Sequence, residues 1–250
     1  MSYPILALWA HPRSMSTAIE RAMRHRSDCY VFHEPFLMQY YRRIGKKIPG
    51  VEMNGFDVQG GYEATRSDIL KRAETQPVFI KDMSYHVLPM MFGDLEFATR
   101  LFNVFLLRDP RKSIASYYKQ DKGLTLEEVG IEAQWRHQSF LRNAIPYRTM
   151  VVGSEDIGRR PNEMMRFIWQ AAGFANEEAA LQWQDRAMPK ELMNVESWHQ
   201  NLIKADGIYH DQRDPDKVFT EAVEKAPHLA EYRAHHQPFY EQLIEQKVNI

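Results

Sequence analysis

The chain has 250 residues, with 32 basic and 33 acidic side chains and a formal net charge of −1 at pH 7. A nearly neutral chain has no global field that would draw it onto nucleic acid or anionic lipid, so any anion-binding site must be local. The hydrophobic fraction of 44% is typical of folded globular proteins, and no apolar stretch approaches the ~20 residues of a membrane span. We expect a soluble protein without a nucleic-acid partner or a membrane span.

Cysteine usage and the N-terminus indicate the compartment. Cys29 is the only cysteine, which excludes an intrachain disulfide and a cysteine-based zinc site and is typical of a reducing cytoplasm. The first residues carry no basic region, and Pro12 follows the first apolar run too soon for a signal helix. The sequence therefore predicts a cytoplasmic protein.

Strand and helix patterns alternate along the chain. Short apolar runs predict five strands, at Ile5–Trp9, Cys29–Phe32, Val78–Ile80, Val104–Leu107 and Met150–Val152. Helical periodicity predicts a helix from Ser16 and others over Pro110–Lys119, Leu126–Asn143, Asn162–Ala172 and Leu229–Val248. Thr125 and Glu128 form a capping-box pattern before one of these helices. The alternation predicts a three-layer α/β fold, with a central parallel sheet of about five strands flanked by helices.

No composition shift marks a domain boundary. A single α/β domain holds this length, so we expect one domain over residues 1–250, with 175–250 a mainly helical C-terminal extension. The stretch Ile44–Gly61 is rich in glycine and proline and predicts a surface loop. Both a substrate-contacting lid and a solvated linker are consistent with such a loop.

The segment after the first predicted strand has the features of a phosphate-binding loop. It lies before a predicted helix, where unpaired backbone N–H groups and the helix dipole favour an anion. Arg13 can bind two oxygens at once, and Ser16 and Thr17 can each donate a hydroxyl near the helix start. The alternative is that Ser16 only caps the helix and Arg13 is a solvated surface charge.

A second motif follows the fourth predicted strand. Residues 108–118 read Arg-Asp-Pro-Arg-Lys-Ser-Ile-Ala-Ser-Tyr-Tyr, which places Arg108 and Ser116 eight positions apart. This pattern is similar to the 3′-phosphate-binding motif of sulfotransferases, and the loop Pro12–Thr17 resembles that family's 5′-phosphosulfate loop. The segment Val151–Phe174 resembles the family's Tyr-Glu-Asp strand and the helix after it. The three motifs occur in the family's order.

The resemblance implies a P-loop-like fold and a metal-independent reaction. Its donor would be 3′-phosphoadenosine 5′-phosphosulfate (PAPS), its product 3′,5′-diphosphoadenosine (PAP), and its acceptor a hydroxyl or amine of a small molecule. The family's 5′-phosphosulfate contacts map onto Arg13, Ser14, Ser16 and Thr17, and its 3′-phosphate contacts onto Arg108 and Ser116.

Three segments depart from the family pattern. Met15 replaces the glycine common within the first loop, so we expect the backbone there to avoid a strongly positive φ. Ser154 stands where many members have tyrosine, which weakens an adenine contact at that position. The C-terminal glycine-rich phosphate segment is not evident, and Lys204–Gly207 is a faint match that an exposed turn explains better.

The acceptor hydroxyl needs a base, and two residues are candidates. Cytosolic family members carry the base in a Lys-Thr-His motif, whose nearest match begins at Lys81, a catalytic candidate, and lacks the histidine. Glu34, in a Glu-Pro pair after the second predicted strand, resembles the bacterial arrangement and is the favoured base if burial raises its pKa. His86 is the other candidate base. The alternative for Glu34 is a carboxylate at a helix N-terminus.

The acceptor and the class of function remain open at this level. Five aromatic residues are candidates for the acceptor pocket, although such residues near a core usually serve packing: Trp9, Phe36, Tyr40, Tyr41 and Phe56. A non-catalytic module that binds PAPS or PAP is one alternative function. An ATP-dependent small-molecule kinase is another, disfavoured because the first loop lacks the glycines and lysine of G-x-x-x-x-G-K-[ST].

Overall fold

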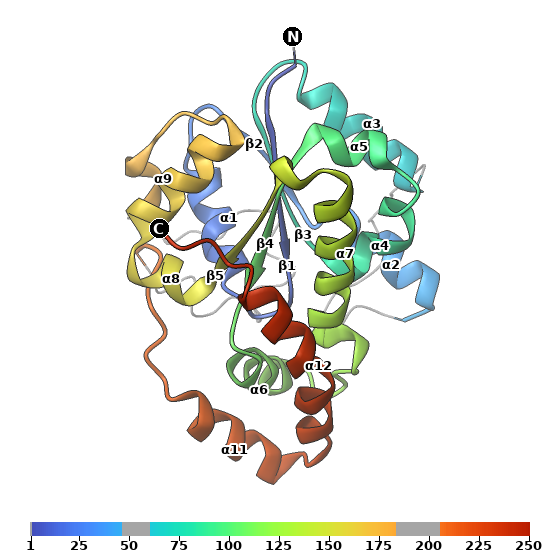
Figure 1. The fold of residues 1–250 in the computed structure, drawn as a ribbon, viewed down its shortest axis with the longest axis vertical. Helices are drawn as coiled ribbons and strands as arrows, with labels where there is room; N and C mark the ends of the chain where they lie inside the picture. The colour runs from blue at the N-terminus through green and yellow to red at the C-terminus, as the bar shows by residue number, and fades with distance from the viewer. Residues whose placement is uncertain (1, 47–60, 184–205) are drawn as a thin grey trace.

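Five parallel strands form one sheet at the centre of the protein (Figure 1). The computed structural model describes residues 2–46, 61–183 and 206–250. The strands are β1 (Ile5–Ala10), β2 (Tyr30–His33), β3 (Val78–Met83), β4 (Leu101–Leu107) and β5 (Thr149–Gly153). They lie in the order β2-β3-β1-β4-β5, and all their pairings are parallel. The expected three-layer α/β fold is confirmed.

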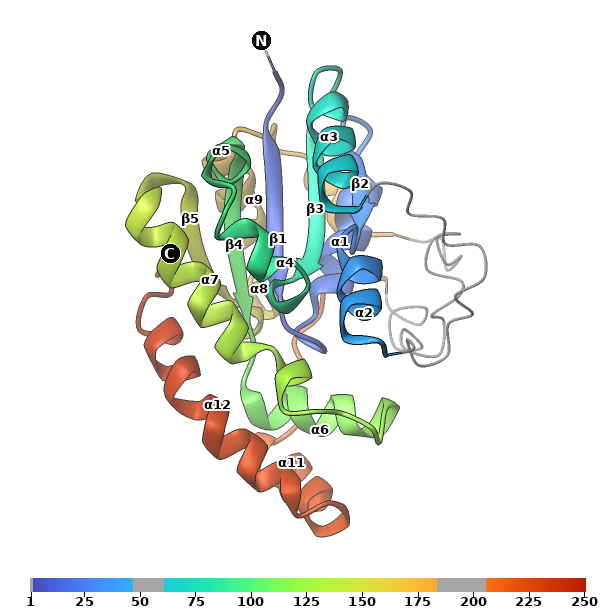
Figure 2. The same cartoon turned by 90° about the vertical axis from the view of Figure 1, so that its right-hand side faces the viewer.

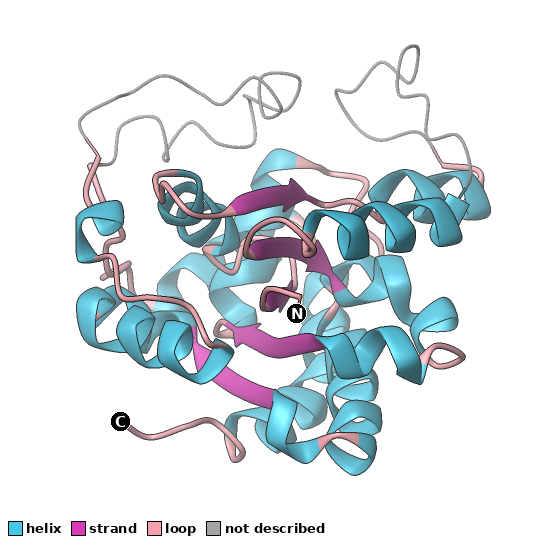
Figure 3. Cartoon of the chain, turned by 90° about the horizontal axis from the view of Figure 1, so that it is seen from above, coloured by secondary structure: helices cyan, strands magenta, loops and turns pink. Residues whose placement is uncertain are grey.

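Helices cover both faces of this sheet, as Figure 3 shows from above. The first six are α1 (Ser16–Arg24), α2 (Leu37–Ile44), α3 (Gly61–Arg72), α4 (Ser84–Met91), α5 (Leu95–Arg100) and α6 (Pro110–Gln120). Those that follow are α7 (Ile131–Ala144), α8 (Ser154–Arg159), α9 (Pro161–Ala172), α11 (Pro215–Lys225) and α12 (His228–Ile244). Within the described ranges, none of them is both long and apolar enough to cross a bilayer.

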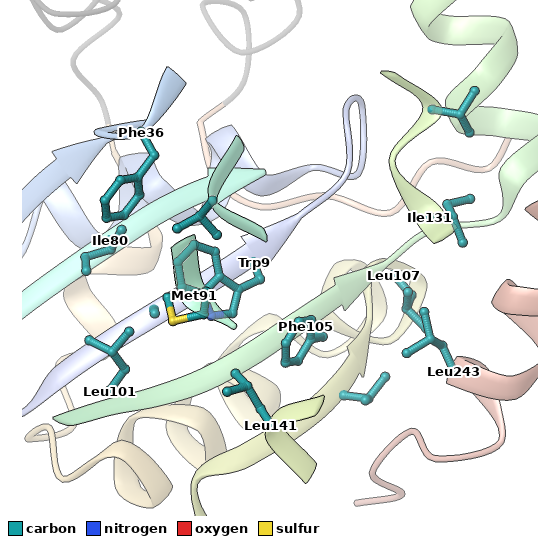
Figure 4. Close-up of a cluster of buried hydrophobic side chains, with 14 of the residues drawn as sticks. Trp9, Phe36, Ile80, Met91, Leu101, Phe105, Leu107, Ile131, Leu141 and Leu243 are labelled. Carbon is teal, nitrogen blue, oxygen red and sulfur yellow. The ribbon is translucent and has the colours of Figure 1, made fainter. Parts of the chain in front are cut away.

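Each face of the sheet has its own core because side chains alternate along a strand. In β1, Ile5, Ala7 and Trp9 pack in one cluster with residues of α3 to α7, α11 and α12. Figure 4 shows this cluster around Trp9. Leu6 and Leu8 pack on the opposite face with residues of α1, α8 and α9. All six residues of β1 are buried, which is the pattern expected of a strand covered on both faces.

Strand β4 begins three residues earlier than the sequence pattern indicates, at Leu101 and not at Val104. The polar residue Asn103 interrupts the apolar run, yet it is fully buried. Its side-chain oxygen accepts a hydrogen bond from the Trp9 indole N–H at 2.8 Å, and its amide group donates to backbone carbonyls. A buried amide with its partners supplied is compatible with a central strand.

The capping box forms, but it does not begin the long helix α7. The Thr125 and Glu128 side chains bond reciprocally to each other's backbone N–H, at 3.4 and 3.1 Å. They close a 3₁₀ turn over Glu127–Val129, after which Gly130 adopts a φ of +82°. The left-handed glycine ends the turn, so α7 begins at Ile131 and the expected start at Leu126 is wrong.

The C-terminal helices α11 and α12 pack against α6 and α7 (Figure 2). Helix α12 ends at Ile244, four residues before the expected end at Val248. The Val248 N–H instead donates to the Val151 carbonyl at 3.0 Å, so the end of the chain lies against the edge of β5. Two further 3₁₀ turns connect elements, at Pro146–Arg148 and Glu178–Leu181.

Candidate functional site

A cavity of about 510 Å³ opens where the strands end. Residues that follow each of the five strands line it, because parallel strands bring their carboxyl ends to one edge of the sheet. Its volume is in the range of small-molecule sites. One lining residue can be named after each strand in turn: Pro12, Glu34, Tyr85, Arg108 and Ser154.

Backbone strain is concentrated at this cavity. Among the described residues, three that are not glycine have a positive φ: Arg13 at 63°, Met15 at 77° and Glu34 at 43°. All three line the cavity. Such conformations cost about 1–3 kcal/mol each and recur at functional sites. The expectation that Met15 avoids a positive φ is wrong, since the tight turn into α1 requires a left-handed residue there, as it would with glycine.

The first loop presents an uncapped helix start to the cavity. Met15 is the N-cap of α1 and makes no side-chain capping bond, which leaves the first backbone N–H groups of the helix to another partner. Arg13, Ser16 and Thr17 line the cavity, as expected of phosphate contacts. Ser14 does not line it: its side chain is buried, and its hydroxyl has no hydrogen-bond partner among the described residues.

The two predicted phosphate motifs meet at the cavity. The Arg13 Nε donates to the Ser116 Oγ at 3.1 Å, and the Arg108 Nη1 donates to the Arg13 carbonyl at 2.6 Å. Burial, followed by the Arg108 charge, lowers the pKa of Arg13 to about 10. Burial also lowers the pKa of Arg108. Two neighbouring guanidinium groups of this kind form a strongly anion-attracting site.

Glu34 lies at the cavity with Lys81 as its counterion. The Lys81 ammonium donates to the Glu34 carboxylate, while Lys81 itself is buried and does not line the cavity. Burial alone raises the pKa of Glu34, but the charges of Lys81, His33 and His86 bring that pKa well below its usual range. The expectation that burial would make Glu34 a stronger base is therefore wrong, because the buried ammonium outweighs desolvation.

His86 also lines the cavity, and a buried carboxylate orients its ring. The His86 Nδ1 donates to the Asp82 Oδ1 at 2.6 Å. Asp82 is held in turn by the backbone N–H groups of Phe36 and Met83, at 2.8 and 2.7 Å. The His86 Nε2 has no hydrogen-bond partner in the part of the chain that the structure describes. The acid that holds His86, four residues before it, was missed in the sequence.

A second carboxylate-histidine pair lies beside the first. The buried carboxylate of Glu20, on α1, accepts from the His33 Nδ1 at 2.7 Å and lies 3.9 Å from the Lys81 ammonium. Burial raises the pKa of Glu20, but His33, Lys81 and Arg24 lower it to about 2. Glu20 gave no signal in the sequence, where it is one of several polar residues of a helix.

The aromatic candidates for an acceptor pocket separate into two groups. Trp9, Phe36 and Tyr40 are buried in the hydrophobic clusters and do not line the cavity, whereas Tyr41 does. Phe56 lies outside the described residues. Leu37, Met83, Tyr85 and Tyr117 also line the cavity and were not among these candidates.

Further residues at the cavity come from the segment before α11. Tyr209, His210, Asp211 and Arg213 line it, although the sequence shows only a polar stretch there. Of the faint match at Lys204–Gly207, Lys204 and Ala205 lie outside the described residues, and Asp206 and Gly207 do not line the cavity. Ser154 lines it and lies at the start of α8. Most of the expected loop Ile44–Gly61, residues 47–60, also lies outside the described residues.

Comparisons with known proteins identify the family and similar folds. The profile of a family described as a sulfotransferase domain matches residues 4–229. The fold is similar to that of the sulfotransferase domain from the curacin biosynthetic pathway, with a TM-score of 0.54 and 15% identity over 91% of this chain and 98% of that one. A sulfotransferase from Alicyclobacillus acidocaldarius is similar at a TM-score of 0.51 and 15% identity, over 95% of this chain and 97% of that one.

One curated relative is much longer than this chain. It is branched-chain-amino-acid aminotransferase-like protein 2 of Arabidopsis thaliana, which is 20% identical over 213 residues. The match covers 84% of this chain and 37% of that protein. The chain thus spans about a third of the length of this relative.

Proposed function

This chain belongs to the sulfotransferase domain family, and we propose that it transfers a sulfuryl group from PAPS to a hydroxyl or amine of a small-molecule acceptor. The observation that carries the proposal is that one cavity holds both the phosphate-binding side chains and the candidate bases. Arg13, Arg108 and Ser116 line it together with Glu34 and His86. A module that only binds the nucleotide has no need of a base such as Glu34 or His86.

The first loop is suited to the 5′-phosphosulfate of the donor. Arg13, Ser16 and Thr17 would bind it, with the uncapped N–H groups of α1 as further donors. Arg13 would stabilise the oxygen that leaves with the 5′-phosphate, since a preorganised cation at a developing charge contributes strongly to catalysis. Arg108 and Ser116 would bind the 3′-phosphate.

Glu34 would accept the proton of the acceptor hydroxyl. Its lowered pKa does not prevent this, because an oxygen that is bonding to sulfur becomes far more acidic than a free hydroxyl and gives up its proton late. In a loose transition state, positioning and charge matter more than the strength of the base. Lys81 would keep Glu34 ionised and hold its orientation.

His86 is the second candidate base, favoured by its own geometry. When the proton lies on the Nδ1 and is donated to Asp82, the Nε2 is the ring atom that can accept another proton. That atom has no hydrogen-bond partner among the described residues. The two candidates are separable by mutation, because each lies at the cavity with its own partner.

The lining near these bases supports a neutral, partly apolar acceptor. Burial raises the pKa of Tyr41, Tyr85 and Tyr117 well above the usual value, so these phenols are uncharged at neutral pH. Leu37 and Met83 add apolar surface. An acceptor with an aromatic or aliphatic body and one hydroxyl or amine fits this lining.

Turnover with labelled donor tests the proposal. We expect label to pass from PAPS to an acceptor in a mixed small-molecule extract, without added metal. Binding of PAP with no label transfer to any acceptor would instead support the non-catalytic alternative.

The base is tested by comparing Glu34→Gln with His86→Asn. Glu34→Gln keeps the shape and removes the base, so kcat should fall by ~10²–10⁴ while PAP binding, measured by calorimetry, persists. His86→Asn should reduce kcat less. If Glu34→Gln retains most of its kcat and His86→Asn loses it, the role belongs to His86.

A further inference from the structure

An acidic side chain forms an ion pair with the arginine that would bind the 3′-phosphate. The Arg108 Nη2 pairs with the Asp211 carboxylate, and both residues line the cavity. Their side chains are 11% and 19% exposed, so solvent screens the pair only partly. Arg108 and Asp211 are 103 positions apart in the sequence, and neither the phosphate motif nor the segment before α11 indicates the contact.

Arg213 also binds the Asp211 carboxylate, and Lys112 binds the Asp211 backbone. The Arg213 Nε and Nη2 donate to it at 2.9 and 2.7 Å, and the Arg213 backbone N–H adds a bond at 3.1 Å. The Lys112 ammonium donates to the Asp211 carbonyl at 2.8 Å. Burial raises the pKa of Asp211, but the bonds from Arg213 and the Arg108 charge bring that pKa well below its usual range. Asp211 is therefore an anion at neutral pH.

A phosphate monoester at Arg108 would meet this anion directly. A bidentate contact between a guanidinium and a phosphate uses two neighbouring N–H groups. On Arg108 these are Nη2 with Nη1 or Nη2 with Nε, and Nη2 already binds the Asp211 carboxylate. Two anions on one guanidinium repel each other at short range in a partly buried site. Either the carboxylate gives way or the phosphate binds more weakly.

Moving the Asp211 carboxylate away from Arg108 should cost little free energy. Arg213, two residues further on, keeps its own bonds to the carboxylate, so the anion stays paired. The segment 209–213 is neither helix nor strand. Helix α11 starts independently of it, because the Asp214 side chain accepts from the backbone N–H groups of Asp216 and Lys217.

We propose that Asp211 is an internal competitor of the 3′-phosphate for Arg108, which lowers the affinity for donor and product and speeds the release of PAP. The inference rests on the proposed function, because it takes PAP as the product. A phosphate monoester carries more charge than a carboxylate, so it displaces Asp211, and the carboxylate returns as the product leaves. Product release, not the chemical step, limits the rate of many enzymes.

Asp211→Asn tests the competition. The variant should bind PAP about tenfold more tightly by calorimetry and release it about tenfold more slowly in stopped flow, since a charge-assisted contact no longer has to be exchanged. Binding of 5′-AMP, which lacks the competing group, should stay unchanged. Asp214→Asn is the matched control: it removes an equal charge three residues away, still caps α11, and should leave both affinities as in the wild type.

Asp211→Ser provides a second variant without the charge and should also tighten PAP binding. Both variants could bind PAP no more tightly than the wild type, with 5′-AMP affinity and melting temperature preserved. That result would overturn the proposed competition and mean that Asp211 positions the arginines. If neither wild type nor variants bind PAP at all, the proposed function itself is wrong and the inference falls with it.

Discussion

At the scale of single residues, the site contains backbone conformations and charged groups that are energetically unfavourable by themselves. Met15 and Glu34 have left-handed backbones, and Glu34 forms a partly buried ion pair with the buried Lys81. Breaking such a pair by removing one partner is far more damaging than its net contribution to stability suggests. A protein retains these features where they serve a ligand, which is consistent with the place of all of them at or beside one cavity.

Arg108 should decide whether the protein distinguishes nucleotides by their 3′-phosphate. In Arg108→Ala, the affinity for PAP should fall toward that for 5′-AMP, because charge-assisted hydrogen bonds of about 1.5–3 kcal/mol each are lost. Calorimetry with the two nucleotides measures the ratio. A variant that still prefers PAP by the wild-type margin would show that the 3′-phosphate binds elsewhere. Arg111→Ala, whose side chain pairs with Asp109 and Asp216 outside the cavity, is the control.

At the scale of elements, glycine turns decide where helices begin and end. Gly130 separates the 3₁₀ turn from α7 with a φ of +82°, and Gly45 ends α2 with a φ of +66°. A Cβ on Gly130 would lie 3.1 Å from a Tyr85 ring carbon and 3.2 Å from the His11 Cβ, whereas no atom of the described residues lies within 4 Å of a Cβ on Gly45. The two glycines thus share the backbone requirement and differ in crowding.

Replacing each of these glycines by alanine separates the two effects. Gly45→Ala should reduce the free energy of unfolding by about 1–2 kcal/mol, the cost of a left-handed backbone. Gly130→Ala should cost more, and it should also weaken acceptor binding because Tyr85 lines the cavity. Urea denaturation measures the first effect and KM for the acceptor the second. Equal losses of stability at both positions would show that crowding at Gly130 contributes nothing.

At the scale of the whole molecule, three buried histidines couple stability to pH. Burial alone lowers the pKa of His137 to about 3. Burial, with smaller contributions from neighbouring charges, lowers the pKa of His11 to about 3 and that of His236 to about 4. His236 must be neutral to accept from the Glu132 N–H and donate to the Leu126 carbonyl. His137 packs on Trp9 of β1, His236 joins α12 to Glu132 of α7, and His11 accepts from the Arg108 N–H.

The sign of the pH effect follows from these lowered values. Between about pH 6.5 and 4 the unfolded chain binds protons that the folded chain does not, so stability should be constant above pH 7 and fall as pH drops through this window. Each histidine should remove about 1.4 kcal/mol per pH unit. In His137→Phe, whose ring can keep the packing on Trp9 and Phe105, the slope should be smaller by one such contribution. A slope equal to that of the wild type in urea denaturation would refute the role of His137.

The sequence by itself determined the parts of this protein that depend on local pattern. Apolar runs located the five strands, and the residues after β1 and β4 indicated two phosphate loops, because strand ends and helix starts impose their chemistry over a few neighbouring positions. The start of β4 was predicted too late because the buried polar residue Asn103 interrupts the apolar run. Its hydrogen bond with Trp9, which is distant in the sequence, cannot be read from the local pattern. The turn at Gly130 was missed for a related reason, since a capping box is compatible with a short turn as well as a long helix.

Only the tertiary structure decided how these local parts combine. The strand order β2-β3-β1-β4-β5 brings Arg13 to Ser116, Glu34 to Lys81 and Arg108 to Asp211, contacts between positions 103, 47 and 103 residues apart. The direction of the Glu34 pKa shift depends on the contact with Lys81. The proposed competition at Arg108 depends on the contact with Asp211. Electrostatic interactions act through space and depend on burial, and neither the distance between two charges nor their exposure is encoded in the pattern of neighbouring residues.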